Sequence, residues 1–546
     1  MADERRSTTL ITLTIDGKQV TVPAGTTVYH AARHAGIEVP VFCYHDRMPP
    51  IGACRVCLVQ VEKMPRLQTS CTLPAQDGMV VHVSSPEAKA GQEAILEFLL
   101  ANHPLDCPIC DKGGECPLQD FTFQFGPGQS RFVQEKRDFP KPIPLGPVLT
   151  LDRERCILCW RCVRFGDIIA GDHALEGFDR GFASQINTAF ARPAHSKFIG
   201  NTIQICPVGA LTSTTYRFRS RPWDTRTVSS VCTHCACGCA MQIDVRGNEV
   251  VRTRARENPA VNDIWLCDLG WFGYDYLNDA GRLTTPLVRK NGELVPAPWE
   301  DALRVVAQKL VAVRAKDPAR IGGIGGARTT NEENYLFQKV FRAILRTSNL
   351  DHRVDVHPAG AGLCARWGMA SAVEDVEKAD VILLAGLDLT EEFPIIWLRV
   401  KKALDSGAAL VIVGPRRPEI APYARHQILT AAGGEAAAVR EILARMDGAP
   451  EPGSEANHPA AVARTVRAAK RPVIMAGRLT LEGPGGPGAL AALEDLAAKL
   501  GTRVEIMRGK GNDTGAALAG VLPDRLPGFG AVADAAVRAA AEQVWG

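Results

Sequence analysis

The chain has 546 residues, of which 46% are hydrophobic and 23% are charged, and its formal net charge is +3 at pH 7. A chain of this length folds into several domains, and its nearly neutral charge gives no indication of nucleic-acid binding. The sequence contains no apolar run of about 18 residues, and the N-terminal MADERRSTTL lacks the apolar core of a secretory signal. We therefore expect neither a membrane-spanning helix nor export.

The 17 cysteines are the most informative part of the composition. Sixteen of them lie between Cys43 and Cys267, and several form C-x2-C pairs. A disulfide scaffold is the competing interpretation, but disulfide scaffolds are short secreted chains. In addition, a disulfide between cysteines this close in sequence cannot link distant parts of a fold. We interpret the cysteines as thiolate metal ligands in a reducing compartment.

The N-terminal segment begins with an alternating strand pattern, ITLTIDGKQVTV, whose Asp16–Gly17 turn predicts a hairpin. A helix is predicted over TTVYHAARHAGI. Four cysteines follow at spacings of ten, two and thirteen residues: Cys43, Cys54, Cys57 and Cys71. Gly52 and Ala53 leave room for backbone N–H groups to approach the sulfurs. The arrangement resembles plant-type [2Fe–2S] ferredoxins, although their first spacing is C-x4-C, and a four-cysteine zinc site is the alternative.

The second group, HPLDCPICDKGGEC, follows a predicted helix over PEAKAGQEAILEFLLANHP and contains His103, Cys107, Cys110 and Cys116. Imidazole nitrogen ligates iron in some iron–sulfur centres. A lone histidine near cysteines can equally cap a helix end, so this segment alone leaves the role of His103 open.

The third group, RCILCWRCVRFG, carries Cys156, Cys159 and Cys162 at the spacing of a [4Fe–4S] ferredoxin. In bacterial ferredoxins the run continues with x3-C-P, and that fourth cysteine binds the other cluster of a pair. Gly166 stands at this position here, and the C-P occurs at Cys206–Pro207. Counting back from it at ferredoxin spacing gives three positions without cysteine: Thr202, Ile199 and Ser196. We interpret the segment as a two-cluster ferredoxin that has lost one cluster, with Cys206 completing the remaining set.

The fourth group, VCTHCACGCA, contains Cys232, Cys235 and Cys239, and Cys267 follows after 27 residues. The group predicts a further [4Fe–4S] cluster, with a zinc ribbon as the alternative. Cys237 lies between two of these cysteines, and a fifth thiolate cannot join a four-iron cube without displacing another. We interpret Cys237 as a spare thiol or as a replacement for one neighbour. Strands are predicted over MQIDVRGNEVVRTRA.

The order of these four groups resembles the large iron–sulfur subunit of bacterial NADH–quinone oxidoreductase, the respiratory complex I. The stretches FIGN before ICPVGAL, and LCDLGWFGYDYLN, match as well. The resemblance is close over residues 10–290 and looser beyond them. It implies one [2Fe–2S] cluster on the first group and three [4Fe–4S] clusters on the others, with His103 as a ligand of the second group. Each of the other three groups has four cysteines of its own, whereas the second group has only three. This difference agrees with a ligand role for His103.

Two enzyme families share these N-terminal modules, the iron-only hydrogenases and the NAD-linked formate dehydrogenases. A hydrogenase would need further cysteines downstream, where only Cys364 remains. Residues 282–546 resemble the molybdopterin oxidoreductases, with buried parallel strands predicted in AVEDVEKADVILLAGLDLTEEFPII and GAALVIVGPRRPEIAPYARHQI. Where formate dehydrogenases place a metal-ligating cysteine or selenocysteine before histidine, this chain has Val356 before His357. Valine has no donor atom, so we expect a vestigial domain without molybdopterin.

We therefore expect a multidomain α+β and α/β protein. Its predicted parts are a β-grasp [2Fe–2S] ferredoxin-like domain (8–88), a domain with a one-His, three-Cys cluster (89–145), a [4Fe–4S] ferredoxin-like domain with one cluster lost (146–222), a [4Fe–4S] domain of molybdopterin-oxidoreductase type (226–284) and a molybdopterin-oxidoreductase-like α/β domain (285–546).

The resemblance implies an electron-transfer subunit of a proton-pumping NADH–quinone oxidoreductase, without catalytic residues or a substrate site of its own. The implied partners are the FMN/NADH-binding subunit, the small [2Fe–2S] subunit and the quinone-side iron–sulfur subunits. The implied location is the cytoplasmic face of the bacterial inner membrane, where partner subunits hold the chain without direct insertion. Electrons are expected to enter near the His103 cluster and to leave from the Cys156 cluster, with the other two clusters beside or off that line.

Overall fold

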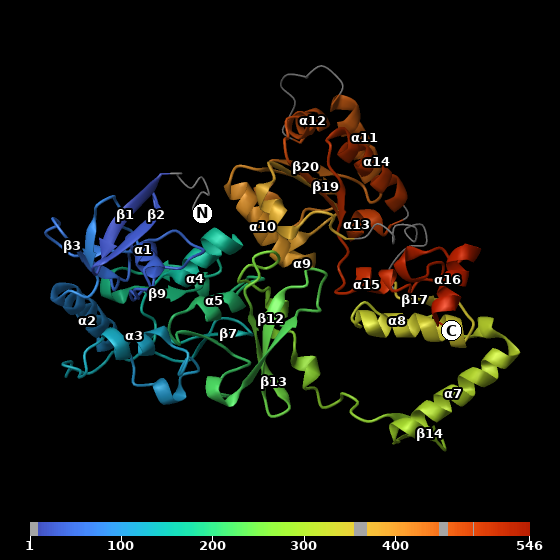
Figure 1. Cartoon of the computed structure of the whole chain (residues 1–546), viewed down its shortest axis with the longest axis horizontal. Helices are drawn as coiled ribbons and strands as arrows, with labels where there is room; N and C mark the ends of the chain where they lie inside the picture. The colour runs from blue at the N-terminus through green and yellow to red at the C-terminus, as the bar shows by residue number, and fades with distance from the viewer. Residues whose placement is uncertain (1–8, 354–367, 447–456, 484, 546) are drawn as a thin grey trace. The chain divides into compact units, whose positions relative to one another are not determined.

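The computed structural model describes residues 9–353, 368–446, 457–483 and 485–545. The chain divides into two compact units. The first unit contains residues 1–228, 243–254 and 266–274, and the second contains residues 229–242, 255–265 and 275–546. Figure 1 follows the chain through its elements.

The N-terminal domain is a five-stranded mixed sheet of order β2-β1-β5-β3-β4. Its strands are β1 (Leu10–Ile15), β2 (Lys18–Pro23), β3 (Leu58–Val61), β4 (Gln68–Thr69) and β5 (Val80–His82). The predicted hairpin is present, and its turn residues Asp16 and Gly17 have φ of 45° and 78°, as a two-residue type I′ turn requires. Helix α1 (Val28–His34) buries four residues in the core that it shares with the sheet. A helix packed on a small mixed sheet agrees with the predicted β-grasp domain.

Two helices frame the second group of ligands. Helix α2 (Pro86–Ala101) begins at Ser85, whose side chain accepts a hydrogen bond from the Ala88 N–H, and has proline in its first turn. Helix α3 (Pro117–Phe125) begins directly after Cys116. Phe121 of α3 packs edge-on against the buried Phe42, with ring centroids 5.4 Å apart, so the first and second domains share one core.

The third domain is built around short elements. A three-stranded sheet of order β10-β7-β6 contains β6 (Ile143–Pro144), β7 (Leu149–Leu151) and β10 (Leu211–Ser213). Helix α4 (Arg161–Arg164) continues into a π-helical turn over Phe165–Ala170, and helix α5 (Gly200–Ile205) ends at Cys206. The hairpin of β8 (Glu176–Phe178) and β9 (Gln185–Asn187) lies between them in sequence.

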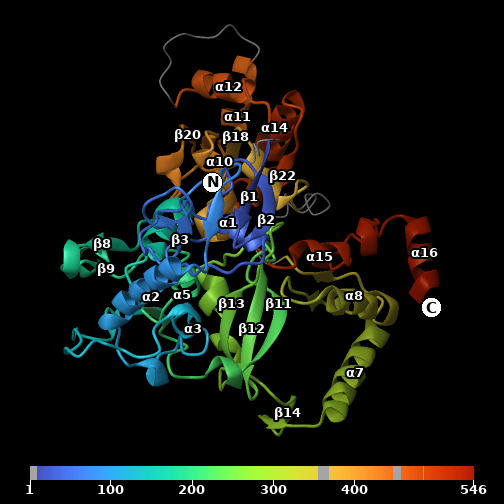
Figure 2. The ribbon, with the colours of Figure 1, turned by 60° about the vertical axis from the view of Figure 1, so that its left-hand side comes forward.

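The strands predicted after the fourth cysteine group are present as β12 (Ala240–Arg246) and β13 (Glu249–Ala255). They form a three-stranded sheet of order β11-β12-β13 with β11 (Arg226–Val231), a strand before the cysteine group that was not predicted. Figure 2 shows the three strands side by side. Helix α6 (Asp268–Phe272) follows Cys267.

The second unit contains a five-stranded parallel sheet of order β20-β19-β18-β21-β22. Its strands are β18 (Val381–Ala385), β19 (Ala409–Gly414), β20 (His426–Leu429), β21 (Pro472–Ala476) and β22 (Val504–Ile506). Every residue of β18 and β19 is buried, as expected for strands covered on both faces. This agrees with the predicted α/β domain.

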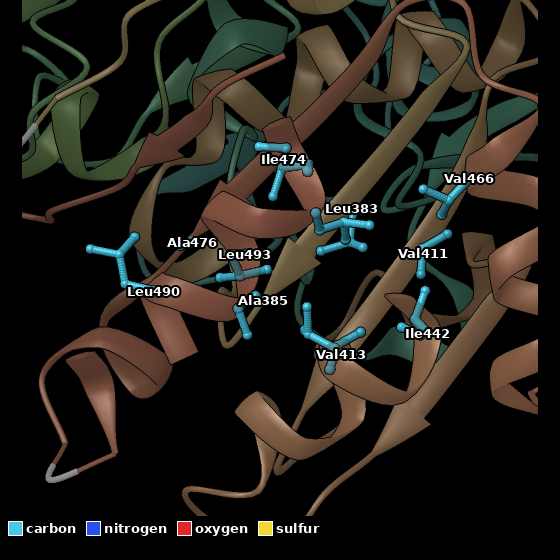
Figure 3. Packing of buried hydrophobic residues seen from close by; sticks show 14 of the residues in the cluster. Leu383, Ala385, Val411, Val413, Ile442, Val466, Ile474, Ala476, Leu490 and Leu493 are labelled. Carbon is cyan, nitrogen blue, oxygen red and sulfur yellow. The ribbon is translucent and has the colours of Figure 1, made fainter. Parts of the chain in front are cut away.

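Three helices pack on this sheet: α11 (Glu435–Met446), α12 (Pro459–Arg467) and α14 (Gly486–Lys499). Figure 3 shows their apolar side chains, among them Ile442, Val466 and Leu493, against Leu383 and Val411 of the strands. Further helices are α7 (Trp299–Lys316), α8 (Asn331–Lys339), α10 (Pro394–Asp405), α15 (Asp513–Leu518) and α16 (Ala535–Trp545). Among the residues that the structure describes, no helix combines the length and the apolar character needed to cross a membrane.

Candidate metal centres

The first cysteine group converges in the N-terminal domain. Side-chain hydrogen bonds join the thiol of Cys43 to Cys54 and Cys71, and join Cys57 to Cys71. The Cys43 N–H donates to Cys54 Sγ at 3.4 Å, and the backbone at Ala53 reaches the Cys43 thiol. The hydrogen bond from Cys54 is the main reason that the pKa of Cys43 falls to about 2. A loop that gathers four thiols and directs N–H groups at them has the features of an iron–sulfur site.

The second group lies between α2 and α3. Cys110 and Cys116 are buried, and Cys107 is exposed. Burial raises the pKa of Cys116 to about 11, with a smaller contribution from Cys110, and Cys107 in turn acts on Cys110. Burial lowers the pKa of His103 to about 4, and the charge of nearby Arg155 adds to this. The imidazole is therefore neutral at physiological pH, which is the form that ligates a metal.

The third group lines a cavity in the first unit. One cavity is lined by all four predicted thiols together with apolar side chains. The lining cysteines are Cys156, Cys159, Cys162 and Cys206. Burial raises the pKa of both Cys156 and Cys159 to about 12, with Cys206 contributing to each. Thiols this strongly buried keep their protons at neutral pH unless a metal replaces them, and an apolar cavity with four convergent thiols fits a four-iron cluster.

The positions of the lost ferredoxin cluster are filled by protein. Ser196 Oγ donates a hydrogen bond to Asp172 Oδ2 at 2.5 Å, and a Cβ atom placed on Gly166 would lie 3.4 Å from Asp172 Oδ1. Thr202 Oγ1 donates to the Ile199 carbonyl oxygen at 2.6 Å. Ser196 and Thr202 thus bond to groups of the protein itself, and the loss of a second cluster stays a prediction.

The fourth group is divided between the two compact units. Cys232, Cys235 and Cys239 lie in the turn between β11 and β12, where the Cys232 N–H donates to the Cys239 carbonyl oxygen at 2.8 Å. Cys237 is hydrogen-bonded to the thiols of both Cys235 and Cys239, and these bonds raise its pKa well above that of an ordinary thiol. Cys267 is buried and caps α6. Cys237 thus lies among the predicted ligands, so its spare or ligand role stays a prediction.

Two arginines connect the first and third groups. Arg161 and Arg164 belong to α4, the helix that carries Cys162. Arg164 Nη1 donates to the Cys43 carbonyl oxygen at 3.2 Å, and its Nη2 donates to the Pro49 carbonyl oxygen. Arg161 donates to the carbonyl oxygens of Tyr44 and Ile205. The loop of the first cysteine group is therefore held directly on the helix of the third.

The second and third groups meet at the loop after Cys206. Cys116 Sγ donates to the Pro207 carbonyl oxygen at 3.7 Å, and a Cβ atom on Gly209 would lie only 2.1 Å from Cys110 Sγ. Only glycine leaves room for the sulfur at this position. One short loop thus carries a ligand of the third group and touches two thiols of the second.

Sequence reasoning missed these bridging residues. The arginines occur inside RCILCWRCVRFG, and their position three residues apart places both on one face of a helix, but nothing in the pattern indicates the loop that they contact. Arg155 was missed as well. It is buried, and Asp106 accepts from its guanidinium at 2.8 and 3.1 Å, while Asp152 lies 3.2 Å away.

The candidate molybdenum positions Val356, His357 and Cys364 lie outside the described residues. The glycine run at 321–327 includes Gly323 of the short strand β16 (Gly323–Ile324), where an added Cβ atom would lie 2.5 Å from the Phe341 ring. Close packing thus accounts for this glycine, which therefore does not indicate a dinucleotide-binding site.

The fold and the cysteine groups define a multidomain protein of the iron–sulfur class. Family models match five segments: the 2Fe-2S iron-sulfur cluster binding domain at residues 8–86, the NADH-ubiquinone oxidoreductase-G iron-sulfur binding region at 92–131, the ferredoxin-like domain of NADH-quinone oxidoreductase subunit 3 at 146–212, the molybdopterin oxidoreductase Fe4S4 domain at 225–279 and molybdopterin oxidoreductase at 282–520.

Curated relatives identify the family. The G subunit of NADH-quinone oxidoreductase from Streptomyces coelicolor is 41% identical over 98% of this chain and 65% of its own length. The G subunit from Mycobacterium tuberculosis is also 41% identical over the same shares, and the G 2 subunit from Rhizobium meliloti is 35% identical over 98% of this chain and 66% of its own length. The chain belongs to the family of NADH-quinone oxidoreductase G subunits. It spans about two thirds of the length of these relatives.

Proposed function

We propose that this chain is an electron-transfer subunit of a proton-pumping NADH–quinone oxidoreductase. The observation that carries the proposal is the enclosed cavity lined by Cys156, Cys159, Cys162 and Cys206, beside two further groups of thiols in the same unit. Iron–sulfur clusters bound at such groups supply one-electron oxidation and reduction. The curated relatives are G subunits of NADH-quinone oxidoreductases, which supports the choice of complex.

The proposed cofactors are one [2Fe–2S] cluster and three [4Fe–4S] clusters, without molybdopterin. The first four-cysteine group would hold the [2Fe–2S] cluster. The three [4Fe–4S] sites would take His103 with Cys107, Cys110 and Cys116, then the Cys156 group, and then Cys232, Cys235, Cys239 and Cys267. A neutral imidazole at His103 and four thiols around one cavity suit these roles, because histidine and cysteine bind metal in their deprotonated forms.

The contacts support an order for the three sites of the first unit. Arg161 and Arg164 join the Cys43 loop to the helix of the Cys156 group, and Pro207 and Gly209 join that group to Cys116 and Cys110. The Cys156 group then lies between the other two and acts as an interior relay. This differs from the expectation based on sequence, which made that group the exit and left the [2Fe–2S] site off the main line.

The partners that we propose are the FMN/NADH-binding subunit, the small [2Fe–2S] subunit and the quinone-side iron–sulfur subunits. One edge of the second site suits a protein partner, because Cys107 is exposed and its neighbours Leu105 and Ile109 are 86% and 55% exposed. An exposed ligand flanked by apolar side chains brings the bound group close to a docked protein. The location that follows is the cytoplasmic face of the bacterial inner membrane, where the partners hold the chain.

Metal analysis of the purified full chain tests this function. We expect about 14 iron and about 14 sulfide per chain, from one [2Fe–2S] and three [4Fe–4S] clusters, and no oxidation of NADH by the chain alone. Addition of the flavin subunit should allow NADH to reduce the chain. Zinc in place of iron, stoichiometric molybdenum with pterin, or NADH oxidation without the flavin subunit would each contradict the proposal.

A His103→Cys variant tests the histidine ligand. Replacing neutral imidazole by thiolate adds one negative charge to the ligand set, so we expect the cluster to assemble with a lower reduction potential. The potential is measured by redox titration followed by EPR. His82→Cys is the control, because His82 is a partly exposed histidine paired with Glu62 at 3.1 Å outside the thiol groups. An unchanged spectrum and potential in His103→Cys would make His103 a bystander.

A further inference from the structure

Arg164 is a buried cation whose hydrogen bonds, within the described part of the chain, go to backbone carbonyl oxygens and not to a carboxylate. It is only 8% exposed, and its side-chain hydrogen bonds go to the carbonyl oxygens of Cys43 and Pro49. The charged or ionisable groups that act on its guanidinium are the thiols of Cys43 and Cys159 and the neighbouring Arg161. A buried charge is costly unless an opposite charge compensates it. Arg164 contacts the Cys43 loop and lies in the same short helix as Cys162, so thiolates that bind a metal at these two sites would supply the opposite charge.

Arg155 shows the opposite arrangement in the same domain. It is also buried, but two carboxylates, Asp106 and Asp152, lie against its guanidinium at 2.8 and 3.2 Å. Its positive charge is therefore neutralised locally. The charge of Arg164 is left to act on the two sites between which it lies.

We propose that Arg164 is a positioning residue that raises the reduction potentials of both the [2Fe–2S] site at Cys43 and the [4Fe–4S] site at Cys159. This inference rests on the proposed function. Reduction adds one electron to each cluster, with no bond made or broken. The added negative charge is attracted by a nearby cation, so Arg164 favours the reduced state on both sides. Its two hydrogen bonds hold the Cys43–Pro49 loop at the distance where this charge acts.

Two variants separate the charge from the hydrogen bonds. Arg164→Gln keeps a donor for a loop carbonyl but removes the charge, whereas Arg164→Lys keeps the charge with a different donor geometry. We expect Arg164→Gln to make reduction of both clusters about tenfold less favourable, a fall of about 59 mV for one electron. Arg164→Lys should stay close to the unmodified protein. Both are measured on the full chain by mediated redox titration with EPR, after iron content has been determined.

Arg66→Gln is the matched control, because Arg66 is an exposed arginine of the first domain, where water screens its charge. Its potentials should not change. Unchanged potentials in Arg164→Gln, or an equal fall in Arg164→Lys and Arg164→Gln, would overturn the inference. Loss of a cluster in both variants would also overturn the inference, since Arg164 would then serve only to hold the loop in place. Loss of a cluster in Arg164→Gln alone would support a need for the positive charge. Absence of clusters from the unmodified chain would instead defeat the proposed function.

Discussion

A Gly209→Ala variant is expected to lose the His103 cluster and about four iron atoms per chain. The new methyl group would lie 2.1 Å from Cys110 Sγ and 3.3 Å from Lys112 Cβ, so the sulfur must leave its position. A thiolate displaced from its site no longer closes the ligand set. The overpacking itself costs about 1–3 kcal/mol of folding free energy, and the measurements are iron content, EPR and the free energy of unfolding.

Gly128→Ala provides the control for this prediction. Gly128 lies in the same predicted domain, and a Cβ atom there would meet no atom within 4 Å. Its iron content and EPR spectrum should equal those of the unmodified chain. A Gly209→Ala variant with all clusters intact would show that Cys110 can move without loss of its metal, and would remove the steric argument for glycine at this contact.

A Cys206→Ala variant is expected to lose the interior cluster, with another fall of about four iron atoms. Cys206 comes from the end of α5, whereas its three partners come from the run before and within α4. Its thiol is the ligand that ties these two segments together, so we also expect faster proteolysis of residues 146–212. If this site lies between the other two, as proposed, electron transfer through the assembled complex should fall to background.

Val208→Ala separates loss of the ligand from loss of packing. Val208 lines the same cavity and is 1% exposed, so its truncation removes buried apolar contacts and lowers stability by the transfer and cavity terms. All four thiols remain, and the iron content should be unchanged. If Val208→Ala lost the cluster as fully as Cys206→Ala, the effect would come from the packing of the cavity and not from the ligand.

Local sequence patterns predicted much of the fold. The Asp16–Gly17 turn between alternating strands, the helix before the second cysteine group, and the apolar runs of β18 and β19 all follow from short-range rules of backbone conformation and burial. The groups of cysteines were also predictable from the sequence, because a cluster needs several ligands at spacings that a short loop can satisfy. Cys206 was predicted to complete the set of Cys156, Cys159 and Cys162, although it is distant in sequence. The prediction came from the absence of cysteine at the ferredoxin position Gly166 and from the C-P at Cys206–Pro207.

The sequence by itself therefore determined the kinds of domain and predicted the ligand sets, since both depend mainly on residues that are close along the chain. Only the tertiary structure decided which sites touch. Arg164 reaches Cys43 across 121 residues, and Cys116 reaches Pro207 across 91 residues. Such contacts depend on how separately folded segments pack against one another, and no local spacing encodes that. The proposed interior position of the Cys156 group and the contacts of the buried Arg164 both follow from that packing.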